Sequence, residues 1–147
     1  MAKIVLSLAL CALLLTFSFP VEAQQPKKIP RIGYLISGSP SSTREIGQVE
    51  AFRQGLRDLG YVEGQNITIE YRYAEGVDER LPKLATELVQ LNVNLIFVSG
   101  TVGTQAAKNA TQTIPIVMAS VTDPVGTGLV ASLAHPGGNV TGLSNLS

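Results

Sequence analysis

The chain has 147 residues, of which 45% are hydrophobic, and its formal net charge is zero. This length fits one ordinary domain, and the apolar fraction is high enough for a packed core, which excludes an intrinsically disordered chain. A neutral chain with 5% aromatic residues and no Trp lacks the basic excess and the stacking surface of nucleic-acid-binding proteins. We therefore expect no nucleic-acid partner.

The first segment has the pattern of a secretory signal. Lys3 supplies a positive start, residues 4–19 form an uncharged apolar run, and Pro20 ends it. Small residues before the expected cleavage point predict cleavage after Ala23, export to the periplasm and no stable membrane insertion of the mature chain. An uncleaved membrane anchor stays open as the alternative, although the run is shorter than the about 20 residues that span a bilayer.

The single cysteine, Cys11, lies inside this apolar run and follows Leu10, which makes a poor lipoprotein signal. Cleavage after Ala23 leaves a chain without cysteine and therefore without disulfides or thiol chemistry. An exported protein of this kind fits a bacterial periplasm. The polar residues 24–30, which contain Pro26 and Pro30, predict a flexible leader.

Short apolar runs alternate with segments of helical periodicity along the rest of the chain. We expect strands at residues 31–36, 67–73, 95–98 and 114–118 and from residue 140 onward, and helices at 42–59, 81–89, 102–110 and 125–134. This alternation predicts right-handed βαβ units and an α/β fold, a doubly wound parallel sheet with helices on both faces.

Local signals bound the first helix. Ser42 with Glu45 three residues later has the spacing of a capping box, and Gly60 ends the helix as a glycine after the C-cap. Apolar residues at helical spacing predict its core-facing side: Ile46, Val49, Phe52, Leu56 and Leu59. At the other end of the chain, the strand that begins at Val140 has no evident partner before Ser147, so we expect a fragment or a truncated chain.

Small and hydroxyl residues follow two of the predicted strands, at the carboxyl ends where open α/β sheets bind ligands. The backbone amides of residues 99–101 open a helix, so the helix dipole would face the same crevice. Asp123 precedes Pro124, and the pattern leaves two roles open for it, a turn carboxylate or a ligand-facing acid.

Several catalytic patterns are absent from the sequence. It contains no GxGxxG, GxxxxGK[ST] or GxSxG motif, and no His, Cys or carboxylate residues at metal-ligand spacing. His135, the single histidine, stands in a Pro-Gly-Gly turn and matches no nucleophile. We therefore expect a protein that holds a small molecule without transforming it, with no catalytic residue, no metal and no cofactor.

The mature chain resembles the ABC-transporter substrate-binding family whose better-studied members take aromatic amino acids. The resemblance rests on RIGYLISGSP, EAFRQGLRDLGYVEGQNITIEYRYAEG, LPKLATELV, VNLIFVSGT and above all IPIVMASVTDPVGTGLVASLAHPGGNVTG. It implies a type I periplasmic-binding-protein fold of two lobes that close over a ligand and deliver it to an ABC permease in the inner membrane. Residues 1–23 would be the signal peptide, 24–30 the leader and 31–147 the N-terminal ligand-binding lobe, with the second lobe absent.

Carried onto this sequence, the resemblance implies ligand-facing residues at the strand ends: Ser37, Gly38, Ser39, Ser99, Gly100, Thr101, Ser120, Thr122 and Asp123. The amides of residues 99–101 would receive a ligand carboxylate, and Asp123 would suit an ammonium group, so Asp123→Asn is expected to weaken amino-acid binding severalfold. Other readings stay open: an extracytoplasmic sensing domain of a receptor, an exported enzyme with its catalytic residues beyond Ser147, and a nonfunctional remnant.

Overall fold

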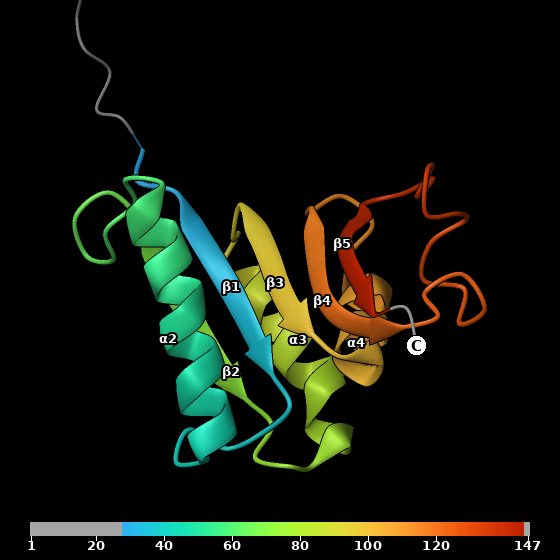
Figure 1. The fold of residues 1–147 in the computed structure, drawn as a ribbon, viewed down its shortest axis with the longest axis horizontal. Coiled ribbons are helices and arrows are strands. Elements are labelled where there is room, and N and C mark those ends of the chain that lie inside the picture. The colour runs from blue at the N-terminus through green and yellow to red at the C-terminus, as the bar shows by residue number, and fades with distance from the viewer. Residues whose placement is uncertain (1–27, 146–147) are drawn as a thin grey trace, which may run out of the picture.

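The computed structural model describes residues 28–145, so the predicted signal segment and its cleavage site lie outside the described residues. The elements in chain order are β1 (Arg31–Ile36), α2 (Thr43–Asp58), β2 (Thr68–Tyr73), the 3₁₀ turn η1 (Asp78–Arg80), α3 (Leu81–Gln90), β3 (Leu95–Ser99), α4 (Thr101–Ala110), β4 (Ile116–Thr122) and β5 (Val140–Asn145) (Figure 1). Within 28–145, none of the helices combines the length and the apolar character needed to cross a membrane.

The strands form one parallel sheet in the order β2-β1-β3-β4-β5. Their arrowheads in Figure 1 all point the same way, so the carboxyl ends meet at one edge of the sheet. The strand order reverses between β1 and β3, which makes this point the topological switch of the sheet. The predicted doubly wound parallel α/β fold is confirmed.

Helices cover both faces of the sheet. The larger core lies between the sheet and α3 and α4, and it includes Leu88, Ile96, Val98 and Ala107, all fully buried (Figure 1). The other face carries α2, which packs over Tyr34 of β1, a strand inside the sheet. The sheet is therefore held mainly from the α3–α4 side, and α2 covers the part formed by β2, β1 and β3.

The α2 helix differs from its prediction in two ways. Ile46 and Leu59 were expected in the core but are 55% and 75% exposed, because only the middle of the apolar stripe packs against the aromatic residues of the sheet. The Ser42 side chain makes no hydrogen bond to a backbone amide; its hydroxyl donates to the Glu45 carboxylate instead. The predicted end at Gly60 is confirmed by its φ of +83° and by its amide, which donates to the Arg57 carbonyl at 2.9 Å.

The segment between β4 and β5 contains no helix, so the helix predicted at 125–134 is wrong. Turns replace it: the amides of Leu129 and Val130 both donate to the Pro124 carbonyl, at 2.9 and 3.1 Å. Gly128, with a φ of +71°, favours a turn over helical backbone. Leu129 and Val130 are buried and anchor the segment to the core.

The last strand does have a partner, contrary to the sequence-based expectation. β4 runs four residues beyond its predicted end at 118, to Thr122, and offers a free edge along which β5 pairs in parallel from Val140 onward. The pairing contains a bulge between Met118 and Val121. Opposite the bulge, Gly142 approaches Met118 so closely that a Cβ atom on Gly142 would overlap the Met118 backbone.

Candidate functional site

The predicted site residues after β1 and β3 lie together at the switch point of the sheet. Ser37 follows β1, and its Oγ lies 3.7 Å from where a Cβ atom on Gly103 would stand, so the first turn of α4 packs beside it. A Cβ atom on Gly103 would only touch Ser37, but it would lie 2.8 Å from Val98 Cγ2 of β3, so the glycine allows α4 to pack closely on that strand. The loop after β1 and the start of α4 therefore lie side by side at the carboxyl edge of the sheet, where the strand-end argument predicts ligand contacts.

Gly100 shapes the turn from β3 into α4. Its φ of +87° and ψ of 160° lie in a region that is essentially restricted to glycine. Its amide donates to the Ala119 carbonyl at 2.9 Å, and its carbonyl accepts from the Thr104 amide at 3.2 Å. The amides of Thr101 and the next two residues precede the first intrahelical bond, so they are free to receive an acceptor atom from a ligand.

The loop after β1 is fixed mainly through its backbone. The Ser37 and Gly38 carbonyls accept from the amides of Gly76 and Glu75, at 2.8 and 3.0 Å. The Ser39 hydroxyl lies 2.9 Å from the Ser41 hydroxyl, within the loop itself. Of these predicted ligand contacts, the Ser39 hydroxyl thus already interacts with the Ser41 hydroxyl of the same loop, whereas the Ser37 side chain faces α4.

The third group of predicted residues lies partly within β4 instead of after it. Ser120 stands at the bulge with a φ of +54°, and Thr122 is the last residue of the strand; both are exposed. Asp123 is exposed too, and its Oδ1 accepts a hydrogen bond from the Gly126 amide at 2.8 Å. Asp123 therefore has one of the two roles that the sequence left open, that of a turn carboxylate. Its Oδ2 atom takes no part in this hydrogen bond.

A groove of ≈ 230 Å³ opens between α2 and the front of β3 and β4. Phe52 and Phe97 are stacked in its wall at a centroid distance of 4.5 Å, and Tyr34 meets Phe97 edge-on at 4.8 Å. Ser99 and Ser120, two predicted site residues, line the same groove. The remaining lining residues are Gln48, Ala51 and Ala119. The groove thus joins an apolar floor to the polar strand ends.

Sequence reasoning missed one charged residue of the site. The Glu45 side chain lies against Gly38, where any Cβ atom would overlap its carboxyl group. Burial, together with the neighbouring Tyr73 and Glu45 charges, raises the pKa of Tyr34 to about 12. The spacing of Ser42 and Glu45 predicts a helix cap, and it does not indicate that the Glu45 side chain lies beside the loop after β1.

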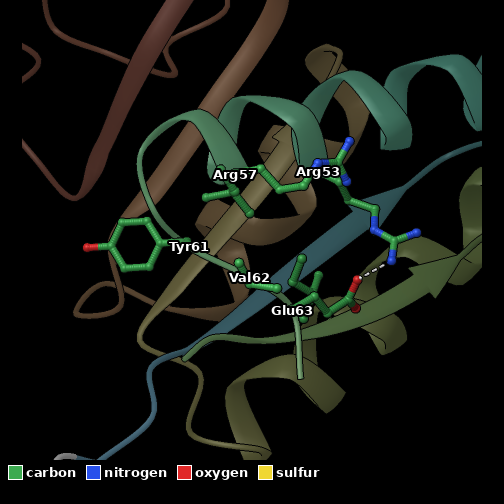
Figure 2. A pocket seen from close by; sticks show the side chains of 7 residues that line it. Arg53, Arg57, Tyr61, Val62 and Glu63 are labelled. Carbon is green, nitrogen blue, oxygen red and sulfur yellow. Dashed lines mark ion pairs between the residues drawn. The ribbon is translucent and has the colours of Figure 1, made fainter. Parts of the chain in front are cut away.

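The opposite end of α2 carries a smaller cavity, of ≈ 80 Å³, shown in Figure 2. Its charged residues are paired: Arg53 contacts Glu63 at 2.9 Å, and Arg57 contacts Glu50 at 2.7 Å. The Tyr61 ring points away from the Arg53–Glu63 pair (Figure 2). Within residues 28–145, no group of three or more His, Cys, Asp or Glu side chains lies close enough together to hold a metal ion.

Comparison with known proteins gives the same family from sequence and from structure. A tyrosine-binding protein of Clostridioides difficile is 44% identical over 96 residues, which cover 65% of this chain and 28% of that protein. The ligand-free, open structure of a substrate-binding protein with adhesive properties from Clostridium difficile matches with a TM-score of 0.75 and 32% identity. That match covers 81% of this chain and 40% of the solved one.

A third relative was solved with a ligand. The structure of an ABC domain from Streptococcus pneumonia in complex with L-Trp matches with a TM-score of 0.70 and 34% identity, over 78% of this chain and 38% of that one. The chain thus spans less than half the length of each of these relatives. The family model for ABC transporter substrate binding proteins matches residues 40–147. The chain therefore belongs to the ABC transporter substrate binding protein family.

Proposed function

We propose that residues 31–147 form the N-terminal lobe of an extracytoplasmic binding protein that takes an amino acid, most favourably an aromatic one, and presents it to an ABC permease. In this proposal the lobe acts in the periplasm after removal of residues 1–23, and it binds without catalysis. A second lobe, outside this sequence, supplies the remaining ligand contacts by closing over the strand ends.

One observation carries the proposal: a polar strand edge and an apolar groove meet at Ser99 and Ser120. An amino acid has the same two parts, a charged end and a side chain. The carboxylate suits the free amides at the start of α4, where the helix dipole favours an anion. The side chain then lies in the groove against Phe97, where an aromatic ring gains from edge-on or offset contact with a ring. The predicted roles of the strand-end residues stay within this proposal.

The relatives support the ligand class. One of them is named for tyrosine, and another was solved with L-Trp. Both ligands carry a flat ring next to the amino-acid group, and the groove is lined by the rings of Tyr34, Phe52 and Phe97. The groove and both ligands therefore share aromatic rings, which favours aromatic amino acids over small or acidic ones as ligands.

The test is a calorimetric titration of the full natural chain with L-tyrosine, L-tryptophan, L-phenylalanine, L-alanine and L-glutamate. We expect the aromatic amino acids to bind most tightly. Ala51→Leu narrows the groove from α2 and is expected to weaken aromatic ligands at least about tenfold, because the added atoms occupy the space of the ring. Thr86→Leu adds similar bulk to an exposed position of α3, on the other side of the sheet, and serves as the matched control.

Two outcomes contradict the proposal. If the wild-type chain binds none of the five amino acids, the proposed function is wrong. If it binds aromatic amino acids and Ala51→Leu binds them as tightly as Thr86→Leu does, the ligand side chain does not occupy the groove. Binding of L-glutamate in preference to the aromatic amino acids would remove the aromatic ligand class.

A further inference from the structure

Glu45 combines a position at the site with an unused charge. It is half-buried in the first turns of α2, and its carboxyl group lies against Gly38 in the loop after β1. The described residues contain ion pairs for five other glutamates, namely Glu50, Glu63, Glu70, Glu75 and Glu87. None of these pairs includes Glu45, so no Lys or Arg of residues 28–145 neutralises it.

The hydrogen-bonding capacity of Glu45 is also largely unused. A carboxylate offers about four acceptor positions, and the hydrogen bond found for Glu45 comes from the Ser42 hydroxyl to Oε2. The Glu45 charge lies near Tyr34, because it helps to raise the pKa of that phenol. A half-buried carboxylate loses solvation without the compensation of a cation, which is unfavourable unless a binding partner supplies one.

Glu45 and the first turn of α4 both lie against the loop after β1. Glu45 contacts Gly38, and Ser37, the preceding residue, faces the first turn of α4. Consecutive Cα atoms are about 3.8 Å apart, so the carboxylate and the free amides lie on either side of one short loop segment. An amino acid carries its ammonium and carboxylate groups on a single carbon, and it could therefore meet both at once.

We propose that Glu45 binds the α-ammonium group of the ligand. This inference rests on the proposed function, because it assumes that an amino acid occupies the strand-end crevice. Asp123 is the rival carboxylate. It is exposed, and one of its oxygens already accepts from the Gly126 amide, whereas Glu45 is half-buried and accepts from no backbone amide of residues 28–145. Gly38 is part of the arrangement because a side chain there would displace the Glu45 carboxyl group.

The test compares two ligands that differ in the ammonium group alone, L-tyrosine and 3-(4-hydroxyphenyl)propanoate, by calorimetry on the full natural chain. Glu45→Gln keeps the length of the side chain and an oxygen that can accept from Ser42. We expect this variant to bind L-tyrosine at least about tenfold more weakly and the des-amino acid within about twofold of wild type, since only the ammonium contact is lost. Glu50→Gln removes the same charge from an exposed position of the same helix and is expected to leave both affinities unchanged.

The possible results separate the two proposals. Failure of the wild-type chain to bind any amino acid overturns the proposed function and this inference with it. If wild type binds L-tyrosine and Glu45→Gln binds it equally well, only the role of Glu45 is overturned. An equal loss for both ligands would mean that Glu45 shapes the loop instead of contacting the ammonium group. A loss in Asp123→Asn together with none in Glu45→Gln would assign the contact to Asp123.

Discussion

The two ends of α2 present opposite arrangements of charge. At the end near Gly60, Arg53 is paired with Glu63 (Figure 2) and Arg57 with Glu50. The Tyr71 hydroxyl lies 3.4 Å from Glu63. At the end near Ser42, Glu45 has no cationic partner within residues 28–145, and the nearby amides of α4 have no helical acceptor. The cavity at the Gly60 end is lined by the paired arginines, whereas the larger groove begins one turn beyond Glu45, at Gln48.

This difference shows what distinguishes a binding site from a structural cluster in this lobe. Paired charges stabilise the folded chain slightly and have little left to offer a ligand, whereas unpaired groups gain when a ligand arrives. The groove that ends at Ser99 and Ser120 is also larger than the cavity between the paired charges. Three predictions test the contrast.

The largest effect is expected from glycine replacements at the two ends. Gly100→Ala forces an alanine into a backbone region that only glycine occupies readily, and we expect a loss of about 3 kcal/mol in the free energy of unfolding. The affinity for the ligand should also decrease, because the turn at Gly100 sets the positions of the first amides of α4. Gly60→Ala, at a φ of +83°, should cost about 1 kcal/mol and leave binding unchanged.

Chemical denaturation and ligand titration of both variants measure these effects. Space is not a confounding factor, since a Cβ atom on either glycine would have no neighbour within 4 Å. Equal losses of affinity in Gly100→Ala and Gly60→Ala would show that the two ends contribute alike to the site and would remove the contrast.

The second prediction concerns Tyr34, which lies between the two ends beneath α2. Its pKa is raised from the ordinary value of 10.0 to about 12, first by burial. The folded state therefore favours the neutral phenol: the stabilisation is complete below pH 10 and is lost as the pH rises to 12. We expect a loss of about 2 kcal/mol in the free energy of unfolding over this interval. Tyr34→Phe keeps the ring packing and should reduce the loss of unfolding free energy between pH 10 and pH 12, measured by chemical denaturation. An unchanged loss would assign it to other tyrosines such as Tyr71, whose pKa is also raised, chiefly by burial.

The smallest effect distinguishes a paired from an unpaired glutamate. Glu63→Gln removes one partner of the Arg53 ion pair, and we expect a loss of about 0.5 kcal/mol that shrinks at high salt. Glu45→Gln removes an unpaired carboxylate and should leave the free energy of unfolding at or above the wild-type value. Urea denaturation at low and high salt compares them. A larger loss in Glu45→Gln than in Glu63→Gln would show that Glu45 is part of the structural framework.

The parallel sheet and the switch-point crevice were predictable because they depend on local signals. Apolar runs, glycine after a helix and small residues after a strand are properties of neighbouring positions, and Gly60, Gly100 and Ser37 lie where these signals put them. The end of the chain was less predictable. The bulge at Ser120 depends on the approach of Gly142 to Met118, which is a contact between strands distant in sequence.

The groove and Glu45 show the same limit. Tyr34, Phe52 and Phe97 come from three separate elements, and each looks like an ordinary core residue in its own segment. Glu45 has the right spacing for a helix cap, and the sequence gives no sign that Gly38 will lie beside it. Such features arise from packing between elements, so no local pattern indicates them.

Val102 has a practical consequence for measurement. It is 53% exposed in the first turn of α4, directly after the predicted ligand residues Gly100 and Thr101. The single cysteine of the chain, Cys11, stands in the predicted signal segment, so the segment from Gln24 onward contains no competing thiol. A fluorophore attached to Val102→Cys would thus be the single label on the segment from Gln24 onward, next to the proposed ligand contacts. A change in its emission on addition of an amino acid would report binding directly.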